Sequence, residues 1–393
     1  MLELLLIPVA SFGYALVSDK LKRKDDDKRK IQVFFEVSGI AIKKEEKLCY
    51  PKFQKKNIDD RSTTYIYTLP VGMPSKIIQK VEDVVSEGLN KPVRIQYDNY
   101  ELNIRVFHKE IPTRWEWSTN LIQERKWRVP IGQSLEELIC HDFDKTPHMT
   151  LGGLTRMGKT VFLKNVFTSL TVANPEHVHF YIIDLKGGLE FGPYTNVKQV
   201  ESIAEKPIEA FQVLSMILKR MEEKMLFMKG HHYTNVVETN IKERYFIIVD
   251  EGAELCPDKS MNREQQKLLG ACQQMLSHIA RIGGALGFRL IFCTQYPTGD
   301  TLPRQVKQNS DAKLGFRLPT ATASHVVIDE PGLETIHSIP GRAIFKTDRL
   351  TEVQVPYITN EKMWDVLKQY EVKKDEHPDT YQNQQTNDDS DLD

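Results

Sequence analysis

A glycine-rich stretch near the middle of the chain constrains the fold more than any other feature. Residues 153–160 read G-L-T-R-M-G-K-T and fit the phosphate-loop pattern G-x-x-x-x-G-K-[ST]. The glycines allow a tight turn whose backbone N–H groups face phosphate oxygens, while Lys159 supplies a cation for the β/γ-phosphates and Thr160 a hydroxyl for Mg²⁺. Residues 148–151 predict a short strand before the loop, and residues 161–170 predict a helix after it.

Two further motifs follow this loop at the ends of hydrophobic runs. Residues 246–251 read F-I-I-V-D-E, so a buried strand ends in two adjacent acids. Asp250 is expected to join the Mg²⁺ shell, and Glu251 to polarise the attacking water. Thr294 and Gln295 end the next predicted strand and could sense the γ-phosphate. We therefore expect catalysis from Lys159, Asp250, Glu251, Thr294 and Gln295, with ATP and Mg²⁺ as cofactors. The expected Mg²⁺ ligands are Thr160 and Asp250, and the expected nucleotide contacts are Gly153, Leu154, Thr155, Arg156, Met157, Gly158, Lys159, Thr160 and Val161.

The composition is that of a soluble protein with an ample core. The 393 residues are 40% hydrophobic and 27% charged, with a formal net charge of −1. A DNA-binding surface would therefore have to be local, because the chain has no overall basic excess. The five cysteines form no C-x-x-C pair, which argues against a zinc site or a disulfide framework and favours a reducing compartment.

The N-terminus has two interpretations. Residues 2–17 are mostly apolar, and a strongly basic run follows between Lys20 and Lys30. Basic residues after the apolar segment suit a membrane anchor that leaves the rest of the chain on the cytoplasmic side, whereas a signal peptide carries its charge first. The alternative is a core helix with a solvated linker. We favour the anchor, which places the protein at the cytoplasmic face of a bacterial membrane.

The region after the linker reads as a small α+β module. Residues 31–37, 62–69, 91–97 and 101–107 predict strands, and residues 76–85 predict a helix behind a Ser75 cap. Residues 70–74 predict a turn. Trp115, Trp117 and Trp127 follow in a connector, where packing between domains is a better interpretation than stacking on bases.

From about residue 128, strands alternate with helices, which is typical of a parallel sheet. The predicted strands are 177–184, 244–251 and 288–295, and the predicted helices are a long one after Pro207, a second over 264–282 and a short one containing Met363, Trp364 and Leu367. Lys186 follows the first of these strands and could serve the nucleotide or a neighbouring subunit. Arg281, Arg289, Arg317 and Arg342 are candidates for a cation acting on a neighbour's nucleotide, although a surface role is the better expectation for each.

These motifs together resemble the FtsK/SpoIIIE family of DNA-pumping ATPases. The resemblance is carried in order by Pro147-His148 and the phosphate loop, Ile183–Gly187, Val249–Leu255, Ala280–Gly287 and Thr294–Pro297. It covers about residues 127–359, and the segment 69–74 with its helix resembles the small module that precedes the motor in that family. The resemblance implies a RecA-like motor that assembles as a hexamer and drives double-stranded DNA through a central channel.

Some features depart from the chromosome translocases of this family. The phosphate loop carries Leu-Thr-Arg-Met where small residues are usual, and Leu185 follows Asp184 where proline is common. We also expect no C-terminal winged-helix domain and at most one membrane span. This layout is more similar to the coupling proteins of conjugative elements, which implies a relaxase and membrane channel proteins as partners.

Other functions stay open at this stage. Similar motors secrete proteins, and a third possibility is a soluble replication or partition motor of a mobile element; a binding module without hydrolysis fits the motifs least. The predicted domains are a possible anchor (1–18), a charged linker (19–30), a small α+β domain (31–126), a RecA-like ATPase domain with a parallel sheet (127–359), and a C-terminal helix with a disordered acidic tail (360–393).

Overall fold

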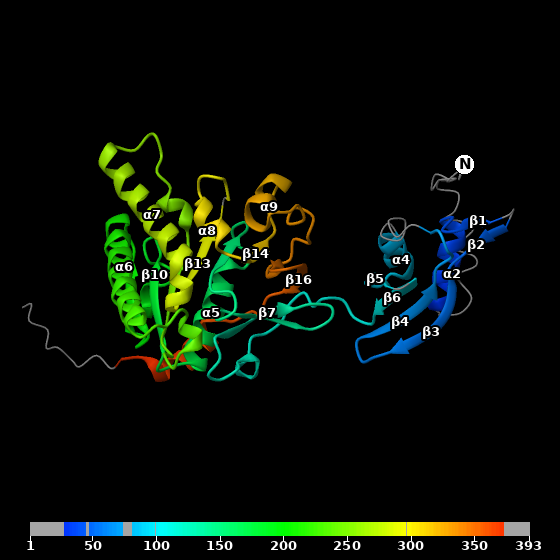
Figure 1. The fold of residues 1–393 in the computed structure, drawn as a ribbon, viewed down its shortest axis with the longest axis horizontal. Helices are drawn as coiled ribbons and strands as arrows, with labels where there is room; N and C mark the ends of the chain where they lie inside the picture. The colour runs from blue at the N-terminus through cyan, green and yellow to red at the C-terminus, as the bar shows by residue number, and fades with distance from the viewer. Residues whose placement is uncertain (1–26, 45–46, 74–80, 99, 296, 373–393) are drawn as a thin grey trace, which may run out of the picture. The chain divides into compact units, whose positions relative to one another are not determined.

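The computed structural model describes residues 27–44, 47–73, 81–98, 100–295 and 297–372, and Figure 1 shows its ribbon. The chain divides into two compact units, residues 1–112 with 133–137 and residues 113–132 with 138–393. The expected anchor, most of the expected linker, the Ser75 cap and the tail from residue 373 lie outside the described residues. Within the described ranges, no helix combines the length and apolar character needed to cross a bilayer.

The first unit has a four-stranded antiparallel sheet and two helices. The order in the sheet is β3 (Lys52–Ile58), β4 (Ser62–Thr68), β6 (Glu101–Phe107) and β5 (Val93–Asp98). A separate pair is formed by β1 (Ile42–Lys44) and β2 (Lys47–Cys49), and the helices are α2 (Asp27–Val37) and α4 (Val81–Leu89). The strands expected over 62–69, 91–97 and 101–107 are confirmed within a residue or two, and Val71 and Gly72 form the expected turn.

The strand expected over residues 31–37 is wrong, because these residues belong to α2. Ile31, Phe34 and Phe35 are buried in the core of this unit, and their spacing of three and four residues is helical. The run of apolar and β-branched residues also fits a strand, so its local pattern did not decide between the two. The helix begins at Asp27, so the last four residues of the expected linker, 27–30, are helical as well.

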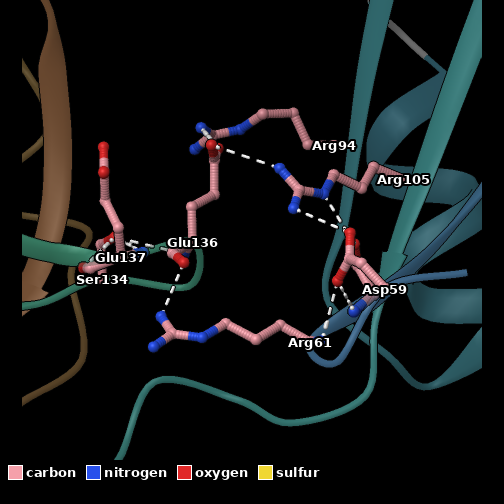
Figure 2. A network of polar contacts seen from close by, with 8 residues as sticks. Asp59, Arg61, Arg94, Arg105, Ser134, Glu136 and Glu137 are labelled. Carbon is pink, nitrogen blue, oxygen red and sulfur yellow. Dashed lines mark hydrogen bonds and ion pairs between the residues drawn. The ribbon is translucent and has the colours of Figure 1, made fainter.

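Charged side chains of this unit form a network of hydrogen bonds and ion pairs (Figure 2). Glu136, in the segment 133–137 that belongs to this unit, forms ion pairs with Arg94 and Arg105, and its carbonyl oxygen accepts a hydrogen bond from Arg61 at 2.6 Å. Arg105 also donates to Asp59 at 3.2 Å. The hydrogen bonds from Ser62 and Arg61, together with the charge of Arg105, lower the pKa of Asp59 to about 2. The network therefore holds the loop of residues 133–137 through several charge-assisted contacts.

The second unit is built on one large, mostly parallel sheet. Six strands run parallel in the order β11 (Val200–Ala204), β10 (Val178–Ile183), β12 (Arg244–Val249), β13 (Phe288–Thr294), β9 (Met149–Gly152) and β14 (Ala312–Phe316). The sheet continues through β15 (Arg342–Lys346), β16 (Leu350–Gln354), β7 (Arg128–Gln133) and β8 (Leu138–Asp142), and β15 pairs antiparallel with both β14 and β16. The predicted parallel sheet is thus confirmed, and it is wider than the sequence indicated.

Helices cover both faces of this sheet (Figure 1). The long helices are α5 (Lys159–Ala173), α6 (Pro207–Gly230) and α7 (Arg263–Leu286), and the short ones are α8 (Arg304–Gln308), α9 (Ala321–Ile328) and α10 (Asn360–Leu367). The 3₁₀ turns are η1 (Thr119–Leu121), η2 (Gly192–Asn196), η3 (Val236–Glu238), η4 (Gly252–Leu255) and η5 (Lys368–Tyr370).

Alternate residues of each central strand enter different cores. In β12, Phe246 and Ile248 pack in the core that contains α5, whereas Ile247 and Val249 pack in the core that contains α6 and α7. The helices predicted after the loop, after Pro207 and over 264–282 are confirmed. Trp117 and Trp127 are buried in the first of these cores, so they pack within the second unit.

Candidate nucleotide-binding site

The phosphate loop joins the central strand β9 to α5. Gly158 has a φ of +114° and caps the helix, a backbone conformation that favours glycine. A Cβ on Gly153 would lie 2.5 Å from Cβ of Phe316 in β14, so only glycine fits there. The loop therefore presents its amides and the N-terminus of α5 to one point, which is an arrangement suited to phosphate.

Lys159 lies inside this loop. Its ammonium donates hydrogen bonds to the carbonyl oxygens of Gly153, at 2.5 Å, and Leu154, at 2.7 Å. Burial lowers the pKa of Lys159, and the nearby carboxylates of Glu251 and Asp250 act in the opposite direction. The side chain is thus held at the loop with two acids close enough to influence its charge.

The two acids arrive beside the loop because of the strand order. β12 lies next to β13, and β13 lies next to β9, so the carboxyl ends of these parallel strands meet at one edge. Asp250 and Glu251 follow β12 and are only 3% and 4% exposed. Burial raises the pKa of Asp250 to about 6, although Lys186 opposes this. Glu251 Oε1 accepts a hydrogen bond from the backbone N–H of Gln295 at 3.1 Å.

Lys186 balances the charge of these acids. Its ammonium lies 3.2 Å from Glu251 Oε2 and 3.8 Å from Asp250 Oδ2. Burial lowers its pKa, but the two carboxylates more than offset this, and the net pKa is raised. The loop that carries Lys186 is positioned by Asp184, whose carboxylate accepts hydrogen bonds from the backbone N–H groups of residues 186, 190 and 191. The sequence left the role of Lys186 open, and the structure places it at the acids of its own chain.

Gln295 connects the loop to the acids. Thr155 donates its hydroxyl hydrogen to Gln295 Oε1 at 2.8 Å, while the Gln295 backbone bonds Glu251. Thr294 is buried, and among the described residues its hydroxyl has no hydrogen-bond partner. Gln295 therefore bridges the phosphate loop and the acid that follows β12.

The oxygen atoms at this edge fit a magnesium ion. Asp250 Oδ2 is buried and, among the described residues, accepts no hydrogen bond, while Thr160 lines the same cavity. Mg²⁺ prefers one or two protein oxygens plus phosphate and water over a cage of side chains. The described part of the chain has no cluster of three or more His, Cys, Asp or Glu able to hold a metal.

A cavity of about 820 Å³ is lined by part of the loop, Thr155, Arg156 and residues 158–161, and by Asp250 and Gln295. Among the other predicted site residues, Gly153, Leu154, Met157, Glu251 and Thr294 do not line it. One side is formed by the predicted residues Lys159, Thr160, Asp250 and Gln295, with Lys186. The other side was not predicted and is lined by Thr113, Arg114, Pro340, Gly341, Gln354, Val355, Pro356 and Tyr357. In the sequence, the Pro-Gly pair at residues 340–341 signals a turn, but no motif connects it with the phosphate loop.

Two of the four candidate arginines are not on the surface, so the expectation of a surface role is wrong for them. Arg289 is 1% exposed and pairs with Asp144 at 2.8 Å, and Arg342 is buried against Glu352 and Gln354. Arg317 donates to the carbonyl oxygen of Ile336. Arg281 lines a second cavity of about 630 Å³ beside α7 and α8, together with His278, Arg304 and several polar residues.

The amino-acid sequence of this region matches a known family. Residues 110–245 match the FtsK/SpoIIIE family. This stretch, which contains the phosphate loop, is similar to the P-loop ATPase domain of that family. DNA translocase FtsK of Chlorobaculum tepidum is 26% identical over 252 residues, which are 59% of this chain and 30% of that protein. FtsK of Listeria monocytogenes is 24% identical over 359 residues, which are 84% of this chain and 45% of that protein. The chain thus spans less than half the length of either relative.

Solved structures share the fold of this chain. The monomer form of TcpA, the pCW3 conjugation coupling protein, with ATPγS has a TM-score of 0.64 at 21% identity and covers 88% of this chain and 99% of that one. The cytoplasmic domain of the type VII secretion ATPase EccC of Thermomonospora curvata has a TM-score of 0.53 at 20% identity, covering 65% of this chain and 32% of that one. The fold is therefore shared by a conjugation coupling protein and a secretion ATPase.

The raised pKa of Asp250 predicts that Asp250→Asn stabilises the nucleotide-free protein. A carboxyl whose pKa rises on folding from 3.8 to about 6 favours the folded state below pH 3.8, and this contribution is lost as the pH rises through about 6. At pH 8 the substitution should therefore raise the free energy of unfolding by roughly 1–3 kcal/mol. Chemical denaturation at pH 8 and pH 4 measures this, with the exposed Asp365→Asn as control. A less stable variant at pH 8 would contradict the prediction.

Proposed function

We propose that this chain is a Mg²⁺-dependent ATPase that moves double-stranded DNA, and that it is the coupling protein of a conjugative or other mobile element. The observation that carries the proposal is the single cavity in which Lys159 and Thr160 of the phosphate loop meet Asp250 and Gln295 from two other strands. A phosphate cradle joined to buried acids is what hydrolysis of a nucleoside triphosphate requires.

The site residues divide the chemistry between them. The loop amides and Lys159 hold the phosphates, and Lys159 stabilises charge that develops during cleavage. Thr160 and Asp250 would hold Mg²⁺, which when bound supplies positive charge to the phosphate oxygens. Glu251 orients and polarises the attacking water, since its carboxylate is fixed by Gln295 and Lys186. Thr294 and Gln295 sense the γ-phosphate.

Motion would then come from subunit interfaces in a hexamer that tighten with ATP and loosen after hydrolysis. The cavity beside α7 and α8 supports contacts with DNA, because Arg281 and Arg304 line it and cations bind phosphates irrespective of base sequence. The similarity in fold to TcpA over 88% of this chain supports the coupling role, with a relaxase and membrane channel proteins as partners. Such a protein would work at the cytoplasmic face of the membrane.

A protein-secretion ATPase is the second candidate, since the cytoplasmic domain of EccC has the same fold. The cargo separates the two, because a secretion motor should be indifferent to duplex DNA. A soluble replication or partition motor would also respond to DNA, but cell fractionation should recover it from the soluble pool.

ATP turnover with and without duplex DNA over a salt series tests the proposal. We expect duplex DNA to raise turnover several-fold at low salt, and this stimulation to fall steeply as salt rises because phosphate contacts release counterions. Lys159→Ala should lower turnover at least about 100-fold, because a cation at the developing charge is lost. The exposed Lys145→Ala is the matched control and should behave as wild type.

The other outcomes are equally informative. Turnover that ignores DNA at every salt concentration would reject the translocase and favour the secretion motor. Turnover that survives in Lys159→Ala would reject the site itself.

A further inference from the structure

The two sides of the nucleotide cavity differ in chemistry, and the sheet order explains how they are placed. The acids and Gln295 follow β12 and β13, on one side of the loop strand β9. Residues 340–341 and 355–357 flank β15 and β16, on the other side of β9. Phe316 pairs with Ala343, and Arg342 pairs with Gln354, so the start of β15 and the end of β16 lie at the same edge as the phosphate loop.

Backbone hydrogen bonds fasten this second side to the loop. The Gly341 N–H donates to Met157 O at 2.9 Å, and the Val355 N–H donates to Gly341 O at 2.8 Å. Gly341 has a φ of +84°, and a Cβ there would lie 2.6 Å from Gln354 Nε2. Residues 340–341 and 355–357 thus form a wall of the cavity that is a fixed part of the site.

Tyr357 stands at the end of the wall and is held from two directions. Its N–H donates to Trp115 O at 2.7 Å, and its carbonyl oxygen accepts from the Trp117 N–H at 2.9 Å. The guanidinium of Arg114 lies 4.5 Å from the centroid of the Tyr357 ring, and Arg114 is itself held by Glu116 at 2.5 Å. The residue is still 38% exposed, although its backbone N–H and carbonyl oxygen are both hydrogen-bonded. A phenol ring paired with a guanidinium plane thus borders the cavity.

Under the proposed function, the phosphate that is cleaved would lie near Glu251 and Gln295. The nucleoside would then extend beyond the loop, toward the side of the cavity that Tyr357 and Arg114 line. There the lining is Pro340, Val355 and Pro356 rather than acids. The guanidinium lies over one face of the Tyr357 ring, and an aromatic ring and a planar cation are both groups on which a base stacks.

We propose that Tyr357 and Arg114 form the base-binding subsite, on which the purine ring of the nucleotide stacks. The inference rests on the proposed nucleotide binding. It assigns residues to the base, which is the part of the ligand that the phosphate loop cannot recognise. Stacking depends on ring area, so a purine triphosphate should bind more tightly than a pyrimidine triphosphate.

Binding measurements with and without a base test this subsite. The dissociation constants of ATPγS, CTP and inorganic tripolyphosphate are measured by calorimetry with Mg²⁺ for the full chain. Tyr357→Leu, which keeps an apolar side chain in the wall, should weaken ATPγS by about 5- to 100-fold and leave tripolyphosphate within about twofold. Tyr357→Phe should keep the affinity for ATPγS, since the ring remains. Tyr233→Ala removes another exposed tyrosine of the same unit and should change neither value.

Each contrary result has a distinct meaning. An equal loss for ATPγS and tripolyphosphate in Tyr357→Leu would show damage to the wall and overturn the subsite. An unchanged affinity for ATPγS, or equal wild-type affinities for ATPγS and CTP, would also overturn it. A wild-type protein that binds neither ATPγS nor tripolyphosphate would reject the proposed function itself.

Discussion

Glu251→Gln is expected to lower ATP turnover by at least about 100-fold while changing the affinity for ATP only a few-fold. Glutamine has the same shape as glutamate and can still accept the hydrogen bond from Gln295. It cannot polarise water as a carboxylate does, and it loses the charge that pairs with Lys186. The variant should therefore bind ATP and fail to cleave it.

Phosphate release and nucleotide binding measured on the same preparation separate these two effects. The matched control is Glu254→Gln, an exposed acid three residues further along the chain that should retain wild-type turnover. A drop in affinity equal to the drop in turnover would mean that Glu251 holds the site together instead of serving the chemical step. Normal turnover would mean that another group activates the water.

The loop and the two acids beside it were predictable because each has a local signature. The phosphate loop has fixed spacing, and Asp250 and Glu251 end a short run of apolar residues that favours a buried strand. Parallel strands that end at one edge then bring them together. The sequence thus indicated the acids and the loop without any knowledge of strand order.

The other side of the cavity has no such signature. Arg114 and Tyr357 are separated by more than two hundred residues and meet through the backbone contacts of residues 115–117 with 357. Neither segment shows the apolar periodicity of a helix or a strand, and a tyrosine after a proline is ordinary in a loop. The strand predicted at α2 failed for a different reason. Its apolar run is compatible with both the helical and the strand period, and only the burial of Ile31, Phe34 and Phe35 decides between them.

No sequence motif indicates the role of Asp144, which is the subject of our second large prediction. Its carboxylate accepts hydrogen bonds from Arg244 Nε at 2.8 Å and Arg289 Nη2 at 2.8 Å. Both guanidinium groups are almost fully buried. Burial lowers the pKa of Arg289 to about 10, which Asp144 opposes. One carboxylate therefore stabilises two buried cations at the start of β12 and β13.

Asp144→Ala is expected to reduce the free energy of unfolding by about 3–5 kcal/mol, because it leaves two buried cations without their anion. Urea denaturation at pH 7 measures this. The control is Glu176→Ala, which breaks an exposed pair with Lys198 and should change stability by roughly 0.5 kcal/mol or less. Replacing Asp144, Arg244 and Arg289 together by apolar residues should recover part of the loss, since no buried charge then remains.

The pH dependence gives this prediction a second test. Burial alone would raise the pKa of Asp144, but Arg244 and Arg289 more than offset it and the net pKa is lowered. The stabilisation is therefore present above the ordinary value of 3.8 and is lost as the pH falls through the lower folded value, so the difference from Asp144→Ala should shrink in acid. The other ends of β12 and β13 lead to Glu251 and Thr294. A loss of stability without this pH dependence would mean that Asp144 acts through packing alone.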